Sequence, residues 1–347
     1  MNETPDNRIN INDPNFMNAV RKTAQKKVLK DIFFDSCVLC SGVCSYILFS
    51  RLFSYVLTHI SSVYTKYAEE GPFSYCCEMI YSLICVGVSF LLVSVLFRWS
   101  RTKNGLWYDI PFDFNYNKTD CALLIVAGLG LCFVGNVFDS ILVNAFSNFG
   151  IEFYSYEDAL SKSGLPANGM EFMVYAVRSA LIPALVEEYA FRGVVMGGLL
   201  KYGEGFAIAM TSVVFGLMHG NFTQVPFAII AGVALGFVRV KTGSMWPSMI
   251  LHFLNNFISV WYSYVTANME HGAMIVSVLV TYGTIFIGVV ALAVYLIRNK
   301  NGMRLKPNKL RFVSYKWLAF ILSPTFLVGA AYLINLMAED IVRGGKM

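Results

Sequence analysis

The chain has 347 residues, of which 56% are hydrophobic and only 14% are charged, and its mean hydropathy is +0.56. Water-soluble domains carry about 25% charged residues, so this composition excludes a soluble protein of this size. The net charge of +5 could suit nucleic acid, but the basic residues are spread between hydrophobic segments instead of forming one patch. The composition therefore predicts an integral, multi-pass membrane protein with a lipid bilayer around it and no nucleic-acid partner.

The hydrophobic segments predict an all-α, polytopic transmembrane helix bundle of about eight or nine spans. In chain order the candidate spans are approximately 35–58, 77–97, 121–145, 172–200, 205–219, 224–239, 246–265, 273–297 and 317–337. The segments 205–219 and 224–239 are short, so the sequence leaves open whether they cross the bilayer completely.

The distribution of Lys and Arg predicts the orientation of the bundle. These residues concentrate in alternate connections, above all in the N-terminal tail, the 98–120 loop and the 298–316 loop. The positive-inside rule then places the N-terminus in the cytoplasm and the C-terminus outside. The polar start has no early apolar core with a cleavage site, so no removable signal peptide is expected. These features fit a bacterial cell membrane, and the endoplasmic reticulum is the alternative location.

The sequence EEYAFR, from Glu187 to Arg192, lies inside an apolar segment that runs from about Phe172 to Leu200. A carboxylate at the bilayer centre costs roughly 2.5–3.5 kcal/mol on insertion scales, so two adjacent glutamates there indicate a functional site. In a helix, Glu188 and Arg192 share a face as i, i+4 residues, whereas Glu187 is turned about 100° away. We therefore expect a structural Glu188–Arg192 ion pair and a second glutamate that faces other groups. A buried ion pair with one spare acid is the alternative.

Two of the four histidines lie within predicted membrane spans. His219 follows Phe215 by four positions and His252 precedes Asn256 by four positions, so each pair shares a helix face. A lone histidine in a membrane helix is more often a packed, hydrogen-bonded residue than a catalytic one. Two such histidines together with an unpaired glutamate favour chemistry instead.

The motifs EExxxR, FxxxH and HxxxN, in this order on three separate helices, resemble those of the CAAX-prenyl protease and bacteriocin-processing family of intramembrane endopeptidases. The resemblance covers roughly residues 172–260 and implies peptide hydrolysis inside a membrane cavity. It implies catalytic roles for Glu187, His219, His252 and Asn256 and supporting roles for Glu188, Arg192 and Phe215.

The chemistry of these side chains is compatible with that activity. Peptide hydrolysis requires an activated water, a hydrogen-bond donor for the carbonyl oxygen and a proton for the leaving amine. Glu187, desolvated and beside the negative charge of Glu188, is suited to act as the general base. His219 can orient the water and pass on a proton. His252 and Asn256 can donate N–H groups to the developing oxyanion.

A metal-dependent mechanism is an open alternative. Glu187, His219 and His252 are acceptable zinc ligands, and three protein ligands leave the fourth position for water. The sequence contains no HExxH motif. We favour activation of water by the glutamate without a metal or another cofactor.

The sequence thus predicts a glutamic or metallo endopeptidase that acts on a membrane-anchored protein or peptide. A non-catalytic scaffold or bacteriocin-immunity protein of the same fold would lack a motif residue, and none is missing. A proton-coupled transporter would show repeat symmetry, which is not evident. The predicted parts of the chain are a cytoplasmic polar and basic tail (1–34), N-terminal transmembrane helices (35–146), an outer loop (147–171), a catalytic transmembrane core (172–265) and C-terminal transmembrane helices (266–347).

Overall fold

The structure is a computed structural model that describes residues 14–68, 71–102, 110–151, 153, 166, 168–267, 269, 271–306 and 314–344. It is 86% helical, and the residues just given contain no β-strand. The predicted all-α, polytopic membrane fold is therefore confirmed. Most of the predicted outer loop at 147–171 and the first 13 residues of the predicted tail lie outside the described residues.

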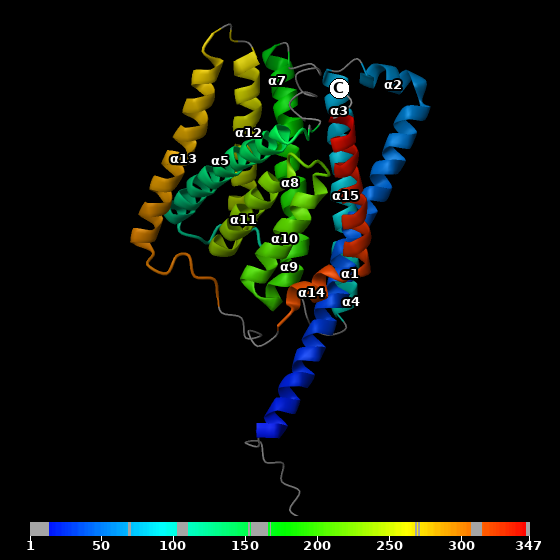
Figure 1. The fold of residues 1–347 in the computed structure, drawn as a ribbon, viewed down its shortest axis with the longest axis vertical. Coiled ribbons are helices and arrows are strands. Elements are labelled where there is room, and N and C mark those ends of the chain that lie inside the picture. Colours follow the sequence, from blue (N-terminus) through cyan, green and yellow to red (C-terminus); the bar gives the residue numbers. More distant parts are fainter. Residues whose placement is uncertain are drawn as a thin grey trace, which may run out of the picture.

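The helices follow one another along the chain with short connections (Figure 1). The N-terminal part contains α1 (Pro14–His59), α2 (Ser61–Ala68), α3 (Pro72–Tyr81), the π-helical segment η1 (Ser82–Val88), α4 (Ser89–Thr102) and α5 (Lys118–Asn148). One continuous helix then contains α7 (Gly169–Ala176), η2 (Val177–Leu181), α8 (Ile182–Glu188), η3 (Tyr189–Val195), α9 (Met196–Leu199) and η4 (Leu200–Tyr202). The remaining elements are α10 (Glu204–Met218), α11 (Val225–Thr242), α12 (Met245–Ala267), α13 (Ala273–Arg298), α14 (Lys316–Ile321) and α15 (Pro324–Gly344).

The first eight predicted spans each coincide with one of these helices or helix runs, whereas the predicted span 317–337 divides into α14 and α15. Within the described residues, six are long and apolar enough to cross a membrane, namely Met17–His59, Pro72–Ser100, Lys118–Asn148, Gly169–Tyr202, Val225–Thr242 and Ala273–Arg298. The helix at the predicted short span 205–219 has 15 residues. Its length of about 22 Å is less than the roughly 30 Å of a hydrocarbon core. The other short span, predicted at 224–239, is an 18-residue helix.

The first helix is longer than the sequence indicates. It begins at Pro14 and contains 46 residues, so the described part of the predicted tail continues the first span as a helix below the bundle (Figure 1). Proline suits the first position of a helix, and the following residues are rich in Ala, Lys, Arg and Gln, which are good helix formers. The N-terminal end of α1, the C-terminal end of α4 and α14 lie at the same end of the bundle, which agrees with the alternation of the basic connections (Figure 1).

Close contacts between small residues hold α5 against α13 and α11 against α10. A Cβ atom added to Gly130 of α5 would lie 2.8 Å from the Cα atom of Gly288 in α13, so the two backbones touch. A Cβ added to Gly232 of α11 would lie 2.9 Å from the Cβ of Ser212 in α10. Membrane helices associate through such small residues because lipid chains compete with larger apolar contacts. This packing makes α5 one wall of the cavity described below.

Candidate active site

The helix that carries both glutamates is interrupted by two π-helical segments, Val177–Leu181 and Tyr189–Val195, on either side of α8. Such segments widen a helix by one residue per turn and frequently lie at functional sites. Pro183 contributes to the irregularity because it has no N–H group and its ring clashes with the carbonyl four residues earlier. Glu187 and Glu188 therefore lie at the end of a short regular stretch between two wide turns.

Glu188 and Arg192 form the ion pair that their i, i+4 spacing suggests. Nη1 of Arg192 lies 2.8 Å from Oε1 of Glu188, and both side chains are completely buried. The guanidinium also donates through Nη2 to the carbonyl oxygen of Gly232 at 3.4 Å and lies 4.3 Å from the ring centroid of Phe215. The arginine charge is thus compensated by a carboxylate, a backbone dipole and an aromatic face.

His252 of α12 forms a hydrogen bond with the Glu188 carboxylate. Its Nδ1 lies 3.0 Å from Oε1 of Glu188, and its Nε2 lies 3.9 Å from Oε2 of Glu187. An ionised carboxylate only accepts hydrogen bonds, so Nδ1 of His252 carries a proton and donates it to Glu188. This leaves Nε2 directed toward Glu187. The i, i+4 spacing predicts only the contact of Glu188 with Arg192, whereas Glu188 also holds the imidazole of His252.

His219 lies at the C-terminal end of α10, where Gly220 adopts a left-handed φ of 62° and ends the helix. Its Nδ1 lies 2.9 Å from the carbonyl oxygen of Phe215, so Nδ1 donates and Nε2 stays available for a ligand or water. The Phe215 ring stands edge-on to both imidazoles, with its centroid 5.0 Å from that of His219 and 5.9 Å from that of His252. Phe215 therefore contacts both histidine rings and restricts their orientation.

Asn256 holds α12 against the irregular helix. Its Nδ2 donates to the carbonyl oxygen of Ser179 at 3.3 Å, and its Oδ1 accepts from Nδ2 of Asn255 at 3.1 Å. The Ser179 carbonyl lacks its usual α-helical donor because the residue four positions later is Pro183. The side chain of Asn256 supplies a donor in its place. The proposed donation to an oxyanion would have to use the second hydrogen of the same amide nitrogen.

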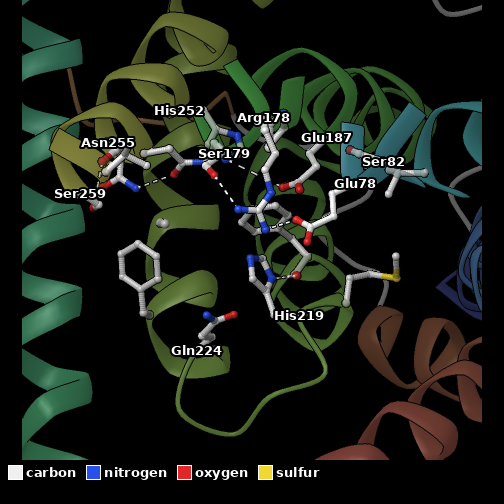
Figure 2. A pocket seen from close by; sticks show the side chains of 18 of the residues that line it. Glu78, Ser82, Arg178, Ser179, Glu187, His219, Gln224, His252, Asn255 and Ser259 are labelled. Atoms are coloured by element: carbon white, nitrogen blue, oxygen red, sulfur yellow. Dashed lines mark hydrogen bonds and ion pairs between the residues drawn. The ribbon is translucent and has the colours of Figure 1, made fainter. Parts of the chain in front are cut away.

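All four predicted catalytic residues line one cavity of about 970 Å³, which the helices of the three motifs form together with α1, α3, η1 and α5. Figure 2 shows Glu187, His219 and His252 in this cavity together with Asn255 and Ser259. The Glu187 side chain is 24% exposed, whereas the neighbouring Glu188 is completely buried. The helical rotation between the two glutamates thus separates a buried structural acid from an accessible one.

Several polar residues of the cavity were not singled out from the sequence. Arg178 forms an ion pair with Glu78 of α3, and Asn136 and Asp139 of α5 also line the cavity. A signal for the first pair was present, because each is an ionisable residue within a predicted span. The two α5 residues likewise interrupt an apolar helix.

The zinc alternative does not match the placement of these side chains. Among the described residues, no three His, Cys, Asp or Glu side chains lie close enough to hold one metal ion. Glu187 and His252 approach to 3.9 Å, but His219 does not complete a three-ligand set with them.

Comparison with known proteins identifies the segment that carries the three motifs. A family model described as "Rce1-like: Type II CAAX prenyl endopeptidase Rce1-like" matches residues 169–258. This segment begins with α7 and ends within α12, so it contains every motif residue. Neither the curated proteins nor the solved structures gave a match. The predicted resemblance is confirmed: residues 169–258 of this multi-pass membrane protein match the model of the Rce1-like type II CAAX prenyl endopeptidases.

Proposed function

We propose that this protein hydrolyses a peptide bond of a membrane-anchored protein or peptide with a water molecule that Glu187 activates. The observation that carries this proposal is the contrast between the two adjacent glutamates. Glu188 is completely buried between Arg192 and His252, whereas Glu187 faces the cavity with Nε2 of His252 3.9 Å away. Glu187 is thus the carboxylate that water and substrate can reach.

In the first step the carboxylate of Glu187 takes one proton from water, and the oxygen of that water attacks the carbonyl carbon of the substrate. A separation of 3.9 Å between Glu187 and His252 is too long for a direct hydrogen bond. One water can bridge these two groups. Nε2 of His219 can accept the second hydrogen of the water, because its Nδ1 is committed to the Phe215 carbonyl.

The attack produces a tetrahedral intermediate with a negatively charged oxygen. His252 can donate a hydrogen bond to this oxygen from Nε2 only as an imidazolium, because its Nδ1–H already points at Glu188. The Glu188 carboxylate stabilises that cation, in the way that a buried carboxylate supports the histidine of a Ser-His-Asp triad. Asn256 contributes its remaining amide hydrogen or acts by holding α12 in place.

The intermediate then collapses. The C–N bond breaks, the protonated Glu187 returns its proton to the leaving amine, and the other product carries the new carboxyl group. Atoms and charge balance with one water consumed and no cofactor. A proton-coupled transporter would also use buried acids and histidines, but the family match favours hydrolysis.

The test is a comparison of membrane proteomes from cells that express the wild type or Glu187→Gln at equal levels. We expect specific membrane proteins to lose a cleaved form in the variant. Glu171→Gln, the same substitution at a partly exposed position in the first turn of the same helix, is the matched control and should behave as the wild type. Identical sets of cleaved forms in the wild type and Glu187→Gln would contradict an endopeptidase.

A further inference from the structure

The cavity contains a guanidinium group that the proposed hydrolysis does not use. Among the described residues that line the cavity, Arg178 is the one lysine or arginine. Its side chain comes from η2 and reaches into the cavity that also contains Glu187 and His219 (Figure 2). We infer that Arg178 binds a carboxylate group of the substrate. This inference rests on the proposed function and adds a recognition site to it.

Two aromatic rings hold the guanidinium in place. Its central carbon lies 5.6 Å from the ring centroid of Tyr75 and 5.2 Å from that of Tyr175. Both tyrosines are buried, and their rings meet edge to face with centroids 5.3 Å apart. Cation–π contacts with rings that cannot move restrict the orientation of the planar group before a ligand arrives. The position of Arg178 is therefore built into the packing of α3 and α7.

The guanidinium has donors left for a ligand. Arginine carries five N–H donors in a planar fork that suits carboxylates. In Arg178, Nη2 pairs with Oε2 of Glu78, and Nη1 has a weak contact of 3.5 Å with Oγ of Ser179. The side chain is 18% exposed, and none of its nitrogens is both buried and unpaired. Its other donors can thus bind an acceptor inside the cavity.

Glu78 acts as a placeholder for the substrate carboxylate. It neutralises Arg178 before a substrate binds, because an unpaired charge within a membrane helix is costly. The Glu78 side chain is 31% exposed, and Tyr67 donates to its Oε1 at 3.4 Å, so the carboxylate keeps a partner when it moves.

The spacing along the helix defines the length of a suitable probe. Arg178 and Glu187 are nine positions apart, or about 13 Å along the axis at about 1.5 Å per residue. About four extended residues at roughly 3.3–3.6 Å each span that distance. A lipid-anchored fluorescent peptide of six residues can therefore place a carboxylate at Arg178 and a peptide bond beside Glu187.

Three forms of this probe test the inference. The first has a free C-terminal carboxylate, the second a C-terminal amide with no acidic residue, and the third a C-terminal amide with one internal Asp. Binding is measured by fluorescence anisotropy in lipid nanodiscs, with Glu187→Gln present in every variant so that hydrolysis does not consume the probe. We expect at least one carboxylate form to bind about tenfold tighter than the neutral form. One hydrogen bond to a charged group accounts for an affinity gain of about this size.

Arg178→Gln should remove this preference, and Glu78→Gln should strengthen it because the competing carboxylate is gone. Arg178→Lys keeps the positive charge but lacks the planar set of guanidinium donors, so this variant should retain only part of the preference for carboxylate probes. Arg178→Gln leaves Glu78 without its cation and can fold poorly. The double variant Glu78→Gln/Arg178→Gln, which has no unpaired charge, should fold and bind all three forms equally.

Each outcome decides the question. Tight binding of the first form assigns the site to a terminal carboxylate, and tight binding of the third form assigns it to an acidic side chain. The inference would be overturned if the protein that retains Arg178 bound all three probes with equal affinity. It would also be overturned if that protein bound none of them. Hydrolysis is measured separately in the protein with Glu187 restored. Cleavage without a carboxylate preference contradicts only the binding of a substrate carboxylate by Arg178. An Arg178-dependent preference without cleavage contradicts only the proposed function.

Discussion

The Glu188 carboxylate and the His252 imidazole are hydrogen-bonded at 3.0 Å, although 64 positions of sequence separate them. The same carboxylate oxygen lies 2.8 Å from Arg192. One buried acid thus connects α8, η3 and α12 and sets which nitrogen of the imidazole carries the proton. In the proposed mechanism Glu188 is a positioning residue that acts through His252.

Glu188→Gln tests this role. Glutamine keeps the size of the side chain but does not stabilise an imidazolium, so we expect kcat to fall by about 10²-fold or more with KM nearly unchanged. A thermal unfolding curve close to that of the wild type shows whether the variant folds normally. Normal kcat in a folded Glu188→Gln protein would remove Glu188 from the mechanism.

Arg192→Ala tests the buried ion pair itself. The substitution leaves the completely buried Glu188 without its cation, a change that costs about 3–5 kcal/mol when one partner of a buried pair is removed. We expect a lower unfolding temperature and a lower yield of folded protein. A variant with normal stability and no activity would instead place Arg192 in the chemistry.

A double-mutant cycle on Asn256 and Pro183 tests how α12 is held. Asn256→Ala should cost about 1 kcal/mol of stability because the Ser179 carbonyl loses its donor. In a Pro183→Ala background a backbone N–H is available to that carbonyl, so the same substitution should cost less. Equal costs in both backgrounds would show that the two residues are not coupled.

The contact between site residues of one helix could be predicted from the sequence, and the contacts between helices could not. The Glu188–Arg192 pair follows from an i, i+4 spacing, which helix geometry alone determines. The bond from His252 to Glu188 depends on where α12 packs. The bond from Asn256 to Ser179 depends on the helix irregularity around a proline. Periodicity in one sequence contains neither the π-helical segments nor the contacts between helices.

The ion pair between Arg178 and Glu78 is another contact between helices that could not be predicted from the sequence. Each was visible as a charged residue inside an apolar segment, but the two lie in different helices and no motif links them. The helical extension of α1 below the bundle also differs from the predicted polar tail, because Lys and Arg residues make a segment polar without preventing a helix. These residues are good helix formers, so the first helix continues through them.

Metal dependence has a direct test. If Glu187 activates water without a metal, protein purified without added metal should contain no stoichiometric zinc by elemental analysis. Its activity should survive prolonged treatment with a strong chelator. Zinc that is lost together with activity and restored together with it would contradict the metal-free mechanism.

The central claim is that the Glu187 carboxylate is the general base, and the most direct test is the single-turnover rate of peptide cleavage by Glu187→Gln in nanodiscs. The substrate is a membrane peptide identified by the proteome comparison, and Glu171→Gln is assayed beside it. We expect the rate to fall by at least about 10²-fold, the usual contribution of a general base, with peptide affinity within a few-fold of the wild type. A rate within a few-fold of the wild type, at the same affinity, would contradict the account.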